Sequence, residues 1–307
     1  MIFNKEKYGK VLVPLMTPFS GDDQSVDFTV ARSLTDHLIE SRNADTIIVS
    51  GTTGEFHTMN FDERTELLQI VHAHVAGRVP LIAGVGCTST IETIRLARAA
   101  EKMGYETMMV VAPYYAKPNQ DEIYQHYRAV AEATSSYIMV YNIPIFTGVN
   151  VESDTLGRLA EIKNIVAVKE EAELNPKQMT AFLNATPDSF IIYNGDDTMI
   201  LEAYAQGGPE RIGGVISGAS HLIGNQIRLM IETFLSGNIS AAAAMQRSFF
   251  PLFRVMSQNQ RTNPAALWKD ALRIAGIDAG VPRLPLSPGT AAEKEKIKAV
   301  LTSLGLI

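Results

Sequence analysis

The sequence has 307 residues, of which 46% are hydrophobic, with 27 basic and 33 acidic side chains. A chain of this length can bury a large core, and it exceeds the usual size of one domain unless the fold is a barrel. One barrel with an appendage and two separate domains are therefore the open choices. The formal charge of −6 is spread along the chain without a long run of one sign, which argues against nucleic acid and anionic membranes as partners.

The sequence contains a single cysteine, Cys87, so an internal disulfide is excluded. Its first residues lack the apolar core of a signal peptide. No uninterrupted apolar segment approaches the roughly 18 residues that a membrane helix needs. We therefore expect a cytoplasmic protein without a membrane partner.

Eight apolar, β-branched runs of strand length follow one another along the chain, at residues 11–15, 46–50, 81–85, 107–111, 138–141, 165–169, 190–193 and 212–216. Each run precedes a helical pattern. Helix starts are marked by Asp27, by Asn60 with Glu63, by the capping box Ser89–Glu92, and by Asn119 with Glu122. This alternation indicates parallel strands with right-handed crossovers. Eight such units predict an α/β fold, the (β/α)8 TIM barrel.

The last part of the chain has no strand pattern. It contains helical patterns near residues 241–256, 265–275 and 291–304, with prolines between the last two. We expect the barrel to comprise residues 1–235. Residues 236–307 then form a C-terminal helical appendage that packs on it.

A doubly wound sheet that binds a dinucleotide is the main competing fold. It is favoured by the glycine-containing segment at residues 84–89, which lies between a predicted strand and a predicted helix. The third glycine of the G-x-G-x-x-G motif is missing, and the segment follows the third strand rather than the first. The barrel is therefore the preferred fold, and no nucleotide cofactor is expected.

The apolar run that ends in Lys169 needs a chemical explanation. Alternation along a strand puts Ala167 and Lys169 on one face. If that face is a barrel interior, the ammonium is partly desolvated, which disfavours its charged form. The neutral amine is a nucleophile for carbonyl carbon. The alternative is a surface lysine at a strand end, neutralised by Glu170 and Glu171.

Hydroxyl side chains are predicted at the same end of the barrel, where barrel enzymes carry their sites. Thr52 and Thr53 follow the second strand, Tyr114-Tyr115 follows the fourth, and Tyr141 ends the fifth. A lysine imine needs a proton shuttle and an anchor for the acid group of its keto substrate. These hydroxyls and the backbone amides of the turn that starts at Gly51 meet both needs. The structural alternatives are a tight turn, loop packing and a barrel-lining aromatic.

Metal catalysis is not favoured by the residue spacing. The six histidines are scattered, and His72 and His74 are two apart on a helix, so they point to different faces. No cluster of histidine and acidic residues has metal-ligand spacing. No base can be assigned to Cys87, which favours a loop or core thiol over a nucleophile. We expect no metal.

Eight short motifs carry a resemblance to a known family: Gly51-Thr52-Thr53-Gly54-Glu55, Pro113-Tyr114-Tyr115, Tyr141-Asn142-Ile143-Pro144, Val168-Lys169-Glu170, Gly195-Asp196-Asp197, Gly214-Val215-Ile216-Ser217, Asn263-Pro264 and Arg283-Leu284-Pro285-Leu286. With them, nearly the whole chain resembles the dihydrodipicolinate synthase and N-acetylneuraminate lyase family of pyruvate-dependent class I aldolases. The resemblance implies a lyase that joins pyruvate to an aldehyde, or cleaves the corresponding 2-keto acid.

The resemblance also implies roles for individual residues. Lys169 would form the imine with pyruvate, so that no separate cofactor is needed. Tyr141, Thr52 and Tyr115 would form a hydroxyl relay that moves protons. In this family Tyr115 reaches across a tight dimer, often within a tetramer, so a homodimer or homotetramer is expected.

On the substrate side, the resemblance implies that Thr53 and the turn amides, including that of Gly51, hold the pyruvate carboxylate. The carbonyl of Ile216 would lie near the reacting centre. The sequence departs from the synthases at Phe146, where they typically carry an arginine that binds the carboxylate of aspartate semialdehyde. A second departure is Glu171-Ala172-Glu173, where small residues are usual.

These departures leave the aldehyde substrate open. The sequence is compatible with a dihydrodipicolinate synthase. It is also compatible with a 2-keto-3-deoxy sugar acid aldolase or with an enzyme like N-acetylneuraminate lyase. A functional alternative of another class is a non-catalytic barrel that binds a keto acid.

Overall fold

The computed structural model of the chain describes residues 3–172 and 177–307. In these residues, eight parallel strands follow one another in sequence order as a closed barrel. The strands are β1 (Val11–Pro14), β2 (Thr46–Val49), β3 (Leu81–Gly84), β4 (Thr107–Val111), β5 (Tyr137–Asn142), β6 (Ile165–Glu170), β7 (Ile191–Asn194) and β8 (Ile212–Ile216). The predicted TIM barrel is confirmed, and no predicted strand boundary is displaced by more than one residue.

The chain divides into two compact units. One unit comprises Met1–Lys10 with Pro80–Ile216, and the other comprises Val11–Val79 with Ser217–Ile307. The predicted boundary between residues 235 and 236 stays a prediction.

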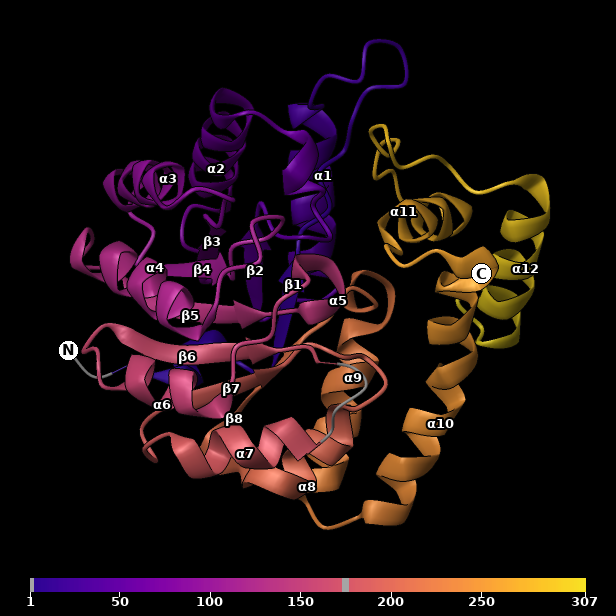
Figure 1. Cartoon of the computed structure of the whole chain (residues 1–307). Helices are drawn as coiled ribbons and strands as arrows, with labels where there is room; N and C mark the ends of the chain where they lie inside the picture. Colours follow the sequence, from indigo (N-terminus) through magenta and orange to yellow (C-terminus); the bar gives the residue numbers. More distant parts are fainter. Residues whose placement is uncertain (1–2, 173–176) are drawn as a thin grey trace. The chain divides into compact units, whose positions relative to one another are not determined.

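The first unit contains strands β3 to β8, and its helices follow the strands along the chain (Figure 1). The helices are α3 (Thr90–Met103), α4 (Gln120–Glu132), α5 (Pro144–Thr147), α6 (Ser153–Ala160), α7 (Lys177–Ala185) and α8 (Ile200–Arg211), and the short 3-10 helix η1 (Lys5–Tyr8) precedes them. All five residues of β4 and of β8 are buried. A strand of a parallel barrel is covered on both faces, which explains the near-continuous apolar runs in the sequence.

Two helix starts of this unit were predicted from capping patterns, and they differ in outcome. The capping box of Asn119 with Glu122 forms at the start of α4. Helix α3 begins at Thr90 as expected, but the predicted box of Ser89 with Glu92 is wrong, because the Ser89 side chain makes no capping hydrogen bond. Glu92 instead lies 3.5 Å from Arg95, one turn further along the helix.

The second unit contains β1, β2 and the C-terminal helices. Its elements are α1 (Phe28–Glu40), η2 (Phe56–Thr58), α2 (Phe61–Val75), α9 (Ser220–Leu235), α10 (Ile239–Met256), η3 (Gln258–Gln260), α11 (Ala265–Ile274) and α12 (Ala291–Ser303). Helix α9 packs on β1, α10 lies along α9 and α12, and α11 contacts α12 (Figure 1). The three predicted C-terminal helices are confirmed.

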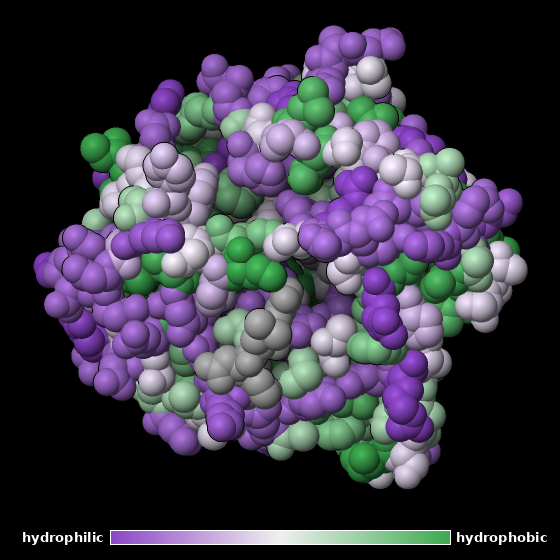
Figure 2. Space-filling model, turned by 45° about the vertical axis from the view of Figure 1, so that its right-hand side comes forward, coloured by the Kyte–Doolittle hydropathy of each residue, from purple (hydrophilic) through white to green (hydrophobic). Residues whose placement is uncertain are grey.

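The surface is mixed in polarity. On the face that Figure 2 shows, hydrophilic side chains predominate and apolar side chains form small, separate patches. In the part of the chain that the structure describes, no helix combines the length and the apolar character needed to cross a membrane.

A buried ion pair links α11 to the turn after β2 inside the second unit. The side chains of Lys269 and Glu55 are 1% and 0% exposed, and Lys269 Nζ lies 2.5 Å from Glu55 Oε1. The same ammonium donates to the carbonyls of Thr17 and Val281 at 2.6 and 2.8 Å. Its three hydrogens therefore all have acceptors. Burial lowers the pKa of Lys269 to about 8, and Glu55 opposes that fall.

We expect Lys269→Met to lower the free energy of unfolding by about 3–5 kcal/mol, because it leaves the Glu55 carboxylate buried without its ammonium. The matched control is Lys7→Met. Lys7 also lies 2.5 Å from a glutamate, Glu106, but the two side chains are 43% and 65% exposed, and exposed pairs contribute at most about 1 kcal/mol. Urea unfolding measures both variants, and equal losses would show that burial does not decide the strength of the pair.

Candidate active site

The site is built on the pairing of two neighbouring parallel strands. In the register of β5 with β6, Tyr141 lies opposite Lys169 and Asn142 lies opposite Glu170. The Lys169 side chain is 6% exposed, and its Nζ donates to the Tyr141 hydroxyl at 3.1 Å. Nζ also lies 4.2 Å from the centre of the Tyr141 ring. The structure therefore brings together the two residues that sequence reasoning placed at the centre of the chemistry.

Glu171 completes this cluster, and it is a residue whose contacts the sequence did not establish. Its Oε2 lies 2.7 Å from Lys169 Nζ and accepts from the Tyr141 hydroxyl at 3.0 Å. Burial raises the pKa of Glu171, while Lys169 and Tyr141 oppose the rise. The signal that could have found it is the period of two along an extended chain, which puts residues 169 and 171 on one face.

The Lys169 side chain is buried as predicted, so the surface alternative is wrong. Glu171, one of the two acids named in that alternative, does lie beside the lysine, 2.7 Å from its Nζ. The expectation that burial disfavours the charged ammonium stays a prediction. Glu173, the other acid of this segment, lies outside the described residues.

Glu170 does not neutralise Lys169, because it points to the other face of β6. Its carboxylate accepts hydrogen bonds from Asn142 Nδ2 at 3.0 Å, Gln178 Nε2 at 2.9 Å and the backbone of Ala172 at 2.9 Å. Asn150 joins this polar network through Asn142 and Gln178, at 2.9 and 2.8 Å. Burial raises the pKa of Glu170 to about 7. The network holds the end of β6 against β5 and α7.

Gly195, directly after β7, leaves the space that Lys169 and Glu171 occupy. A Cβ atom at this position would lie 2.7 Å from Lys169 Cε, 2.8 Å from Glu171 Cβ and 2.9 Å from Glu171 Oε2. At these distances a side chain at residue 195 would force Lys169 and Glu171 to shift. The absence of a side chain at residue 195 is thus a condition for the present geometry.

The predicted carboxylate anchor lies in the turn after β2, in the second unit. Gly54 N donates to Gly51 O at 3.0 Å, and Glu55 N donates to Thr52 O at 2.9 Å. Gly51 is buried, while Thr52 and Thr53 are half-buried. The turn is formed as expected, and its role beside Lys169 stays a prediction.

The remaining predicted residues lie in three separate segments of the first unit. Tyr115 follows β4, has φ 70° and is 93% exposed. Phe146 lies on α5 and is 36% exposed, and Ile216 ends β8 with 1% exposure. None of the contacts that link Lys169, Tyr141 and Glu171 involves these three residues, and their roles stay predictions.

Two further features bear on where chemistry is possible. Among the described residues, no group of three or more histidine, cysteine, aspartate and glutamate side chains is arranged to hold a metal ion.

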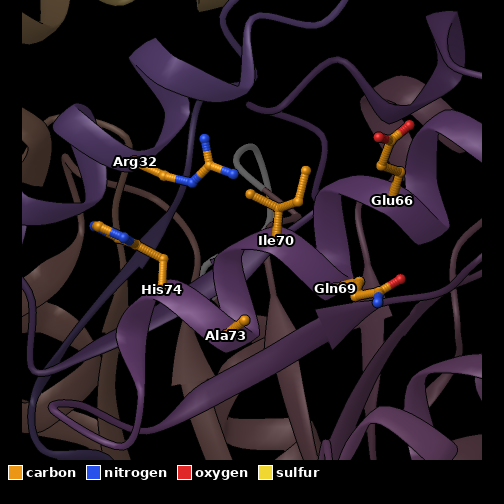
Figure 3. A pocket seen from close by; sticks show the side chains of 6 residues that line it. All are labelled: Arg32, Glu66, Gln69, Ile70, Ala73 and His74. Atoms are coloured by element: carbon orange, nitrogen blue, oxygen red, sulfur yellow. The ribbon is translucent and has the colours of Figure 1, made fainter.

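A surface groove of about 450 Å³ lies between α1 and α2 (Figure 3), and its lining residues are Arg32, Glu66, Gln69, Ile70, Ala73 and His74. None of these was a predicted site residue.

Comparison with known proteins gives matches along nearly the full length. The model of the Dihydrodipicolinate synthetase family matches residues 7–304. The chain is 44% identical over 300 residues to the 4-hydroxy-tetrahydrodipicolinate synthase of Desulforudis audaxviator, covering 98% of this chain and 99% of that protein. It is 41% identical to the 4-hydroxy-tetrahydrodipicolinate synthase of Moorella thermoacetica, covering 98% and 100% of the two chains.

Solved structures give the same result. The structure of dihydrodipicolinate synthase from Cyanidioschyzon merolae with lysine bound has a TM-score of 0.91 at 39% identity, covering 98% of this chain and 99% of that one. The matches confirm the predicted resemblance, the lyase class and the type of reaction, that of a pyruvate-dependent class I aldolase. The chain belongs to the dihydrodipicolinate synthetase family.

Proposed function

We propose that this protein uses the amine of Lys169 to form an imine with pyruvate and joins the resulting enamine to an aldehyde, or runs the reverse cleavage. The observation that carries the proposal is the buried Lys169 amine, 3.1 Å from the Tyr141 hydroxyl at the C-terminal ends of β5 and β6. In a TIM barrel these strand ends are where active sites lie.

The proposed reaction proceeds through an imine and an enamine at Lys169. The neutral amine of Lys169 attacks C2 of pyruvate, and loss of water gives the protonated imine. This cation withdraws electrons from C3, so a C3 proton leaves and an enamine forms. The enamine carbon then attacks the aldehyde carbon, whose oxygen takes a proton. Water finally hydrolyses the imine and frees the lysine.

Protons must move at each of these steps, and Tyr141 is the nearest hydroxyl to the nitrogen. Its oxygen contacts both Lys169 and Glu171. By the family resemblance, Thr52 and Tyr115 extend this relay. Thr53 and the amides of the Gly51 turn would hold the pyruvate carboxylate, and the Ile216 carbonyl would face the reacting centre.

Borohydride reduction with pyruvate tests the proposal. We expect one reduced pyruvate on the Lys169 peptide, because reduction converts the imine into a stable amine. Lys169→Ala should abolish the adduct, and Lys163→Ala, at an exposed lysine six residues away, should retain it. Peptide mass spectrometry gives the readout.

Two outcomes would contradict the enzyme assignment. Wild-type protein without an adduct would remove the imine mechanism altogether. An adduct combined with no turnover of any aldehyde would favour the alternative of a keto-acid-binding barrel that performs no catalysis.

The proposal includes a homodimer or homotetramer whose sites are completed by Tyr115 of a neighbouring subunit. In the single chain this side chain is 93% exposed, with φ 70°. A residue other than glycine at positive φ is uncommon, and a ring at this exposure is accessible to a neighbouring subunit. A subunit interface would bury it.

We expect light scattering to find no active monomer. Co-expression of inactive Lys169→Ala and Tyr115→Phe subunits should restore part of the activity, because a mixed dimer contains one site with both residues intact. Each variant expressed alone is the control. Failure of the mixture to exceed the two controls would place Tyr115 in its own subunit's site or outside the chemistry.

For the second substrate we propose an aldehyde without a carboxylate next to Phe146. A charge-assisted hydrogen bond to a carboxylate contributes about 1.5–3 kcal/mol, and phenylalanine cannot supply it. Glu171 adds a carboxylate to the site, 2.7 Å from Lys169 Nζ, which repels a second carboxylate. Both features disfavour aspartate semialdehyde, the substrate that the synthases' arginine binds.

We therefore expect a panel of aldehydes, run with pyruvate, to give higher kcat/KM for uncharged or sugar-derived aldehydes than for the semialdehyde. Phe146→Arg should improve use of the semialdehyde by about tenfold to a hundredfold, the equivalent of one charge-assisted hydrogen bond. Phe146→Leu is the control for loss of the ring. A wild type that prefers the semialdehyde would make the Phe146 argument wrong.

A further inference from the structure

We propose that Glu171 is a further catalytic residue of this site: it removes the proton that keeps Lys169 unreactive, and returns it to the oxygen that leaves as water. This inference rests on the proposed imine at Lys169. It assigns to a carboxylate a step that the hydroxyl relay does not perform.

The position of Glu171 meets the geometric demand for this role. Its Oε2 lies 2.7 Å from the nucleophilic nitrogen, within the range for direct proton transfer. Its backbone N–H donates to Asn142 O at 3.0 Å, which fixes the residue to the end of β5. Its side chain is 17% exposed, so the carboxylate is held close to Lys169 with little room for bulk water.

The order of hydrogen bonds explains why a carboxylate is needed. Lys169 donates to the Tyr141 oxygen, and the Tyr141 hydroxyl donates onward to Glu171. A neutral phenol is far too weak a base to hold a proton taken from an ammonium, whereas a buried carboxylate is a much stronger base and can hold it transiently. Tyr141 can therefore connect the two groups, and Glu171 is the group where the proton can stay.

Burial of Glu171 favours such a transfer. It raises the pKa of the carboxylate, and Asp196, after β7, acts in the same direction, while Lys169 on β6 and Tyr141 on β5 stabilise the charged form and oppose the rise. Glu170, the adjacent residue, is a second acid that interacts with it. The result of these influences is a pKa above the ordinary value for glutamate, which makes Glu171 a better proton acceptor than a solvated carboxylate.

The proposed step balances in atoms and charge. The Lys169 ammonium gives one proton to the Glu171 carboxylate, and the neutral amine forms the C–N bond with C2 of pyruvate. The second proton on nitrogen moves to the former carbonyl oxygen, which gives a neutral carbinolamine. Glu171 then gives its proton to the departing hydroxyl, which leaves as water. The product is the protonated imine beside a Glu171 carboxylate, so the pair of charges at the start is restored.

The same arrangement has a consequence for the imine itself. Its positive nitrogen replaces the ammonium at the same carboxylate, so the ion pair is present both before and after imine formation. Glu171 thereby acts on the rate of proton transfer rather than on the amount of imine formed at equilibrium. A variant without the carboxylate should reach imine slowly, but it should reach it.

The experiment measures how fast the pyruvate adduct forms, by rapid mixing, borohydride quench and intact-mass analysis over a range of pH. We expect Glu171→Gln to slow adduct formation about 10²- to 10⁴-fold at neutral pH, and the deficit to shrink as pH rises and hydroxide deprotonates the lysine. Glu171→Asp, which keeps a shorter carboxylate, should fall between Gln and wild type. Glu161→Gln, at an exposed glutamate of the same unit, should match wild type.

The outcomes separate this inference from the proposed function. Wild type without an adduct contradicts the proposed function itself. Wild type with an adduct, and Glu171→Gln with the same rate at every pH, overturns only the role of Glu171. A final adduct yield below that of wild type in both Glu171 variants also overturns it, since Glu171 would then hold the fold or bind pyruvate instead of moving a proton.

Discussion

The parallel pairing of β5 with β6 determines where every reactive group of this site lies. It sets Tyr141 opposite Lys169 and Asn142 opposite Glu170, so one face of the pair carries an amine and a phenol, and the other carries a satisfied polar network. A slip of one residue would exchange these faces. Lys169 would then meet the network of Asn142, and Glu170 would enter the site. The network around Glu170 makes such a slip costly, because three donors would lose their acceptor.

Two buried lysines in the described part of the chain show how neighbours decide the use of an ammonium. Lys269 has one carboxylate and two backbone carbonyls around it, so each of its three N–H groups has a fixed acceptor. Lys169 has a carboxylate and a phenol instead. The phenol accepts from the amine and donates to the Glu171 carboxylate, so it connects the two groups for proton transfer. Burial is common to the two lysines, and the chemistry of the acceptors differs.

The barrel was predictable because strand and helix periodicities are local, and all eight strands were placed within one residue. Lys169 was predictable for the same reason, as a charged residue on an apolar strand. Glu171 was named as a departure from a motif and as a neutralising partner of Lys169, but its contact with Tyr141, thirty residues earlier, could not be read from a local pattern. Lys269 was missed, because a lysine on a predicted helix is ordinarily solvated and its partner Glu55 lies far away in the sequence. The predicted capping box of Ser89 with Glu92 does not form, and Glu92 lies beside Arg95 instead. The setting of Thr52 and Tyr115 depends on packing between distant segments, or between chains, which no local pattern encodes.

Gly195 constrains Lys169 and Glu171, which lie in an earlier segment of the chain. A methyl group there would collide with Lys169 Cε and with the Cβ of Glu171. Shortening Glu171 would not remove the second clash, because every residue except glycine has a Cβ atom. A side chain at residue 195 would therefore displace Lys169 and the segment around residue 171. Glu171 is thus open to change by single mutations, whereas Gly195 is not. As long as residue 195 is glycine, residue 171 can therefore be substituted without a clash at this point.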